Sequence, residues 1–65
     1  MDSKILGHLQ RKINERVEDV IESIASGGSK DFAEYKEKCG VIRGLRLAHM
    51  EVSDLAGRLK ESEDE

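Results

Sequence analysis

The chain has 65 residues, of which 38% are charged, with no proline, a single cysteine and a formal net charge of −3. A chain this short forms at most one domain and buries only about 60% of the surface that its unfolded form exposes, so its own core stabilises it weakly. Cys39 is the only cysteine, which excludes a disulfide within the chain and suits a reducing compartment. The acidic balance disfavours a general nucleic-acid binder. The sequence has no long apolar segment, so we expect neither secretion nor membrane spanning.

The first predicted element is an amphipathic helix over residues 3–25. Its apolar residues recur at spacings of three and four, which places them on one stripe of a helix; they are Leu6, Leu9, Ile13, Val17, Val20 and Ile24. The sequence SGGS at residues 26–29 then ends the helix. Gly27 and Gly28 can adopt positive φ, and Ser29 is a suitable N-cap for the next helix, with Asp31 in its first turn.

The second predicted element is a longer helix over about residues 30–61. Apolar positions recur from Phe32 to Leu59 without an interrupting proline. A short connection between two helices favours an antiparallel arrangement. The sequence therefore predicts an all-α fold, a single two-helix hairpin over residues 1–61, followed by an acidic disordered tail at 62–65.

Two features predict that this hairpin is completed by oligomerisation or by docking on a partner. Folding the chain about residue 28 places Ser3 opposite Ser53, so that Leu55, Ala56 and Leu59 project past the first helix. The apolar surface of the second helix is also wider than one stripe. Val41, Leu45, Ala48, Val52, Ala56 and Leu59 share one face, while Phe32, Cys39 and Met50 lie roughly 120–140° around the helix from them.

The chemistry-bearing residues do not form a recognisable catalytic or metal site. His8 and His49 fall at about the same level of the predicted hairpin but on faces that do not converge, and zinc needs three or four converging ligands. Cys39 is about 15 Å along the helix from His49, too far for a nucleophile and its base. We therefore expect a non-enzymatic protein without a metal or a cofactor.

The centre of the second helix is the predicted interface. Gly40 and Gly44 are four residues apart and leave a flat strip that another backbone can approach. Arg43 and Arg46 project near Lys36 and can meet acidic protein groups or, less favoured, nucleic-acid phosphates. The full set of predicted interface residues is Phe32, Tyr35, Gly40, Arg43, Gly44, Arg46, Leu55 and Leu59.

The segment DFAEYKEKCGVIRGLRLAHMEVSDL, residues 31–55, places an aromatic residue and a tyrosine before the motif G-x-I-x-G-L and an amphipathic end. It resembles small helical proteins encoded in the structural-gene clusters of tailed bacteriophages, near portal and capsid genes. The resemblance implies a component of the virion or of its assembly, present in many copies on portal, head or tail proteins, in the virion or the host cytoplasm. It brings no catalytic residues with it.

A second hypothesis for the function comes from architecture alone. Two hairpins of this length can pair as a four-helix bundle, as in the small plasmid RNA-binding regulator called Rop. The similarity is in size and layout, without a matching motif on the exposed face of the first helix. A dimeric regulator or adaptor that binds nucleic acid therefore stays open as an alternative.

Overall fold

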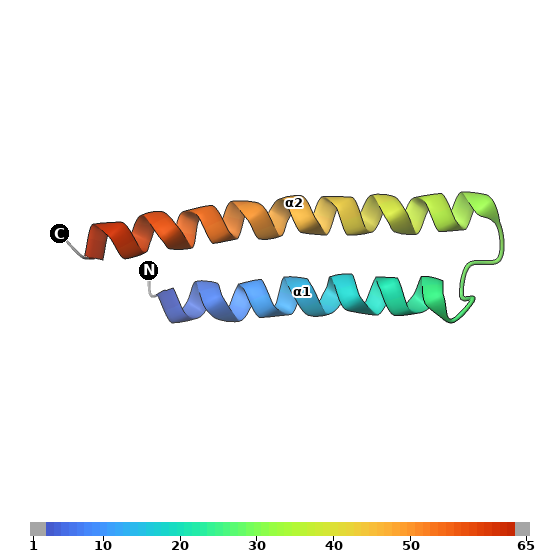
Figure 1. Ribbon diagram of the computed structural model, residues 1–65, viewed down its shortest axis with the longest axis horizontal. Coiled ribbons are helices and arrows are strands. Elements are labelled where there is room, and N and C mark those ends of the chain that lie inside the picture. Colours follow the sequence, from blue (N-terminus) through green and yellow to red (C-terminus); the bar gives the residue numbers. More distant parts are fainter. Residues whose placement is uncertain (1–2, 64–65) are drawn as a thin grey trace.

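The computed structural model describes residues 3–63 as two antiparallel helices, α1 (Ser3–Ala25) and α2 (Phe32–Glu63), joined by residues 26–31 (Figure 1). This confirms the predicted all-α hairpin, and the described residues include no strand. Helix α2 begins two residues later than expected and continues to Glu63, two residues into the predicted tail. Residues 64–65 of that tail lie outside the described residues. Within residues 3–63, neither helix has an apolar stretch long enough to cross a membrane.

Helix α1 ends in a glycine-based cap. Gly27 has a φ of 80°, which glycine adopts readily because it lacks a Cβ atom. The amide of Gly27 donates to the carbonyl of Ile24 at 3.1 Å, and the amide of Gly28 donates to that of Ser23 at 2.8 Å. These two bonds form a Schellman motif, which satisfies carbonyl groups that the end of the helix leaves unpaired. Of the two glycines expected to allow positive φ, Gly27 is the one that adopts it.

Helix α2 is capped by Asp31, and the expected N-cap at Ser29 is wrong. The Oδ1 atom of Asp31 accepts a hydrogen bond from the amide of Glu34 at 2.8 Å, which is the geometry of an N-cap residue three positions ahead. Ser29 lies two residues farther from the helix start, and its hydroxyl is buried without a hydrogen-bond partner. Both serine and aspartate suit an N-cap, so residue type alone did not distinguish the two positions.

Two hydrogen bonds between the helices define their register. Near the loop, the Nζ atom of Lys38 donates to the Oγ atom of Ser23 at 2.7 Å. Farther along the hairpin, the Nε2 atom of Gln10 donates to the Oγ atom of Ser53 at 2.8 Å. Ser53 therefore lies opposite Gln10, and the expected pairing of Ser53 with Ser3 is wrong.

This register corrects the predicted overhang at the C-terminal end. Leu55, Ala56 and Leu59 lie alongside α1, where Ala56 and Leu59 are half-buried and Leu55, turned sideways, is 44% exposed. The register is shifted because the connection extends past the end of α1, so that the first turn of α2 lies beyond that end (Figure 1). Part of the overhang is thus at the loop end, where Phe32 is 72% exposed.

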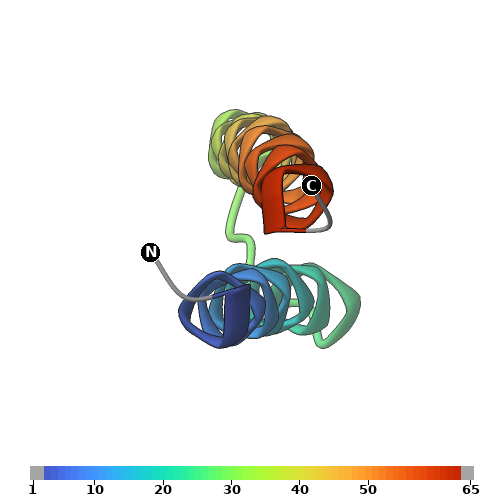
Figure 2. The same cartoon turned by 90° about the vertical axis from the view of Figure 1, so that its left-hand side faces the viewer.

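The core between the helices is small. Only Leu6 and Val17 are buried among the described apolar side chains, at 4% and 5% exposure. The end-on view shows why, since the molecule is a single layer of two helices and neither helix is enclosed (Figure 2). Each helix covers the other along one side only.

The face that α2 turns toward α1 also differs from the predicted stripe. Val41 is 45% exposed and Ala48 is exposed, although both belong to the apolar face predicted for this helix. Half-buried residues on the inner face instead include the polar Lys38, His49 and Ser53. A polar side chain can occupy such a face when it has a hydrogen-bond partner, as Lys38 and Ser53 do. A count of apolar positions alone does not detect this rotation of the helix.

Candidate functional site

The largest anomaly of the molecule is its exposed apolar surface. Nine large apolar side chains are exposed among the residues that the structure describes, namely Ile5, Leu9, Ile21, Phe32, Tyr35, Val41, Leu47, Met50 and Leu55. The accessible surface is 5148 Å² for a chain of 7.3 kDa, whereas a compact monomer of this mass exposes roughly 4,200 Å². The excess is close to the area of about 800 Å² that one partner contributes to a standard protein–protein interface.

An open groove of about 430 Å³ concentrates part of this surface along one flank of the hairpin. Its lining combines apolar side chains from both helices with two arginines: Ile21 of α1, and Cys39, Ile42, Arg43, Arg46, Leu47 and Met50 of α2. Leu47 and Met50 are 58% and 65% exposed, which is high for large apolar side chains. The groove is the structure's best candidate for a binding surface.

The groove has a positive rim. Arg43 and Arg46 both line it and both are exposed, so their guanidinium groups can be reached from solvent. Lys36, about two turns from Arg43 toward the loop, is exposed as well. None of these three side chains has an ion-pair partner among the residues whose side chains are described. An apolar groove with unpaired basic groups at its edge suits an amphipathic helix that brings acidic side chains.

The predicted aromatic pair lies at the loop end of the same helix. The rings of Phe32 and Tyr35 have centroids 6.1 Å apart and are tilted by 33° to each other. A hydrogen bond to the Cys39 side chain, followed by the charge of its thiolate and by partial burial, raises the pKa of Tyr35 above its ordinary value of 10.0. A tyrosine is neutral at physiological pH with or without this shift, and Tyr35 is 40% exposed.

The predicted glycine strip does not belong to the groove. An added Cβ atom at Gly40 or Gly44 would meet no other atom within 4 Å, so both positions face open space in the isolated hairpin. At 100° per residue, Gly44 projects from the flank of α2 opposite to Arg46. Leu55 lies on that opposite flank, where it lines a smaller groove of about 330 Å³ with Glu51 and Arg58 among others. Leu59 is half-buried.

The structure therefore divides the eight predicted interface residues among different surfaces. Arg43 and Arg46 come together in the groove, and Phe32 and Tyr35 continue its side of α2 toward the loop. Residue type and spacing placed all eight on one helix, but they did not separate its two flanks.

The residues with metal-binding or nucleophilic chemistry do not converge. His8 is exposed on α1, whereas half-buried His49 lies between the helices with its Nδ1 atom 3.5 Å from the Oγ atom of Ser53. Because Ser53 lies opposite Gln10, His49 is level with a position near Asn14, and the expected alignment of the two histidines is wrong. Over the described part of the chain, no group of three or more His, Cys, Asp or Glu side chains is placed to hold a metal ion.

Five of the seven groove residues were absent from the predicted site, namely Ile21, Cys39, Ile42, Leu47 and Met50. Ile21 widens the apolar stripe of the first helix, yet it is 41% exposed because α2 covers only one side of α1. Leu47 lies between Leu45 and Ala48, which belong to the apolar face predicted for the second helix, whereas Leu47 does not. The helical angle between Leu47 and Met50 was the signal that could have found it, since positions three apart fall on the same face.

Comparisons with known proteins give no relative from which a function can be transferred. No family model matches this chain, and neither the curated proteins nor the solved structures show a similar one.

Proposed function

We propose that this chain is a non-enzymatic structural or assembly component of a tailed-bacteriophage virion. In this role it is a small multimeric helical protein that binds portal, head or tail proteins, in the virion or in the host cytoplasm during assembly. The resemblance of residues 31–55 to small helical proteins of phage structural-gene clusters supports the setting. The exposed surface of α2 supports the mode of action.

The observation on which the proposal depends is the imbalance between core and surface. In the described part of the chain, two apolar side chains are buried and nine large ones are exposed. At about 25 cal/mol per Å² of apolar area removed from water, covering even part of that surface stabilises a complex appreciably. A chain with this imbalance gains more from a partner than from its own core.

A direct test places the chain beside its expected partners. The gene is co-expressed with the portal, head and tail proteins encoded near it, and assembled particles are purified and analysed by mass spectrometry. We expect a fixed copy number of the chain per particle. The variant Met50→Glu, which puts a charge into the groove, should leave the helix content unchanged and remove the chain from particles.

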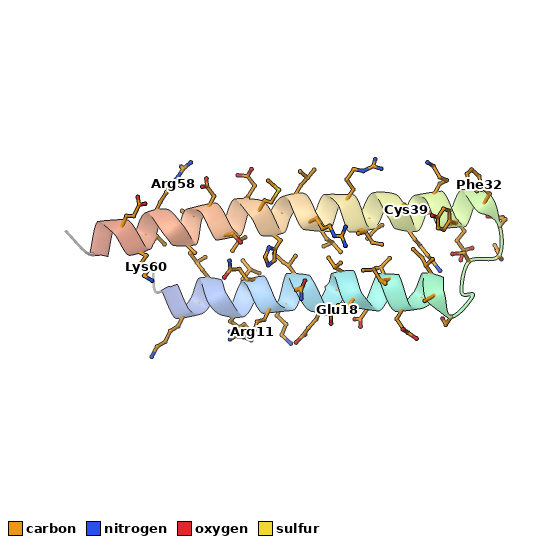
Figure 3. All side chains as sticks on the ribbon, in the orientation of Figure 1. Arg11, Glu18, Phe32, Cys39, Arg58 and Lys60 are labelled. Atoms are coloured by element: carbon orange, nitrogen blue, oxygen red, sulfur yellow. The ribbon has the colours of Figure 1, made fainter. Side chains whose placement is uncertain are left out.

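The matched control introduces the same residue on the other helix. Arg11 points away from α2 (Figure 3), so Arg11→Glu should not affect incorporation. A gene without portal or capsid genes nearby, or particles that assemble without the chain, would contradict the virion role.

The exposed pair Arg43 and Arg46 favours a second candidate function, that of a dimeric regulator or adaptor binding nucleic acid. Phosphate contacts make binding depend steeply on salt. A gel-shift assay across salt concentrations tests this alternative. Salt-sensitive binding that Arg43→Ala and Arg46→Ala abolish would favour the regulator over the virion component.

A further inference from the structure

We infer that the partner of the outer side of α2 is a second copy of this chain, bound antiparallel through α2. This inference rests on the proposed function, in which the chain is multimeric and binds through α2, and it names the surface and the orientation of the contact between two copies. It comes from a stripe of residues on the side of α2 turned away from α1. We call it the outer stripe: Lys36, Gly40, Arg43, Leu47, Met50, Asp54, Gly57 and Glu61.

The outer stripe has the spacing of a coiled-coil seam. Its members are separated alternately by four and three residues, an average of 3.5, which keeps a row of side chains facing a partner helix. All eight residues are exposed in the isolated hairpin. Over this span α2 is about 38 Å long, at 1.5 Å per residue. The hairpin itself offers nothing that covers this side of α2, as the end-on view shows (Figure 2).

The order of residues along the outer stripe is self-complementary. With a two-fold axis between positions 48 and 49, Leu47 faces Met50 of the second copy, and Arg43 faces its Asp54. Farther out, the same axis sets Gly40 against Gly57, and Lys36 against Glu61. Every basic residue of the stripe thus meets an acidic one, and every layer occurs twice.

The charges select the antiparallel orientation over the parallel one. The basic members of the outer stripe, Lys36 and Arg43, lie in the first half of α2, and the acidic members, Asp54 and Glu61, lie in the second half. A parallel pairing in register would put like charges in contact at all four layers, whereas the antiparallel pairing puts opposite charges there. Charges at a protein–protein interface fix register and exclude wrong arrangements more than they add affinity.

The centre of the outer stripe supplies the affinity. Leu47 and Met50 are 58% and 65% exposed and would cover each other in both halves of the symmetric dimer. The two glycine layers leave room for the long aliphatic parts of the Lys36 and Arg43 side chains, because an added Cβ atom at Gly40 or Gly57 meets nothing within 4 Å.

Existing interactions within the chain are compatible with this pairing. Lys36, Arg43 and Glu61 have no ion-pair partner among the residues whose side chains are described. Asp54 accepts a hydrogen bond from Arg58 at 2.8 Å through its Oδ2 atom, with both side chains exposed. A carboxylate has two acceptor oxygens, so Oδ1 of Asp54 is available to Arg43 of the second copy.

A charge-swap experiment tests the inference. Arg43→Asp alone and Asp54→Arg alone each create like-charge contacts in a homodimer, and we expect each to weaken dimerisation at least about tenfold. An equimolar mixture of the two variants should form heterodimers with wild-type affinity, because all of the facing charges are then opposite. Sedimentation velocity gives the affinities, native mass spectrometry counts the heterodimers, and recovery on mixing shows that both variants fold.

The matched control makes the same changes on α1. Arg11 and Glu18 both point away from α2 (Figure 3), so Arg11→Asp and Glu18→Arg should leave dimerisation unchanged. A mixture of the Arg43 and Asp54 variants that shows no preference for heterodimers would overturn the inference. A wild-type chain that stays monomeric would overturn it too, while binding to virion proteins would still decide the proposed function separately.

Disulfide formation tests the register independently. In a Cys39→Ser background, one chain carries Leu47→Cys and the other carries Met50→Cys. We expect the mixed pair to form a disulfide faster than either variant with itself, because positions 47 and 50 face each other across the axis. Faster formation between identical variants would indicate a parallel dimer and overturn the inference.

Discussion

The two helices differ in how their apolar side chains are distributed. Most of those of α1 follow one stripe, whose two best-buried members, Leu6 and Val17, form the centre of the core, while Ile5 and Ile21 widen the stripe and are exposed. Those of α2 extend around the helix, from the inner Leu45 to the exposed Leu47 and Met50. A helix that packs against a single neighbour needs only one stripe. The wider distribution on α2 indicates that this helix has a second neighbour.

The largest expected difference between the two helices comes from placing the same charge on each of them. Val17→Asp puts a carboxylate at a position that is 5% exposed, and we expect it to cost more than about 3 kcal/mol and to unfold the hairpin. Leu47→Asp changes a side chain that is 58% exposed and should keep the helical signal of a dilute sample. Circular dichroism during thermal unfolding distinguishes them. Equal losses of helical signal from the two substitutions would mean that the hairpin also needs the outer side of α2 in order to fold.

Alanine substitution of two glycines, one in the turn and one at the centre of α2, should have opposite effects on stability. At Gly28, an added Cβ atom would lie 2.6 Å from the carbonyl oxygen of Ser23, so Gly28→Ala should destabilise the hairpin by about 1–3 kcal/mol. At Gly44, the space is open and the backbone is helical, so Gly44→Ala should stabilise it by up to about 1 kcal/mol. Chemical denaturation measures both. A stabilising Gly28→Ala would show that the loop relaxes without cost.

The hydrogen bond between Gln10 and Ser53 defines the register far from the loop. Ser53→Ala leaves the half-buried amide of Gln10 without this partner, and we expect a loss of about 0.5–1.5 kcal/mol. The control is Gln10→Ala in the Ser53→Ala background, which should add little further loss, since the bond is already absent. Additive losses from the two substitutions would show that the bond does not contribute to stability.

The smallest expected effect concerns Tyr35. Cys39 raises the pKa of this tyrosine, so Cys39→Ala should lower that pKa toward its ordinary value of 10.0. A raised pKa in the folded state favours the neutral form. This contribution to stability is present below pH 10 and is lost as the pH rises through the pKa of the folded protein. Tyr35 is the only tyrosine, so tyrosinate absorbance reports it directly. An unchanged titration would exclude the hydrogen bond.

The sequence predicted each helix better than it predicted how the helices meet. The three- and four-residue spacing of Leu6 to Ile24 depends on neighbours within the same helix, and so does the end of α1 at Gly27. The partner of Ser53 and the exposure of Val41 depend on the other helix. A small change in the path of the loop shifts every one of these contacts, and the loop sequence does not specify that path.

The candidate site divides in the same way. Arg43, Arg46 and the aromatic residues were identified from residue type, and the structure places both arginines in the groove. Ile21 and Leu47 were missed because a residue becomes part of a groove only when its neighbours leave it uncovered. Whether a residue is left uncovered depends on how the two helices are arranged, and the residue pattern along either helix does not specify it.

What the sequence determined by itself is therefore local: two helices, the turn between them and the order of charges along α2. Hydrogen bonds and apolar spacing over three or four residues are sufficient to specify these features. The tertiary structure alone decided the register, the rotation of α2 against α1 and the surfaces left exposed. Those depend on contacts such as Lys38 with Ser23 and Gln10 with Ser53, which join residues that are distant in the chain.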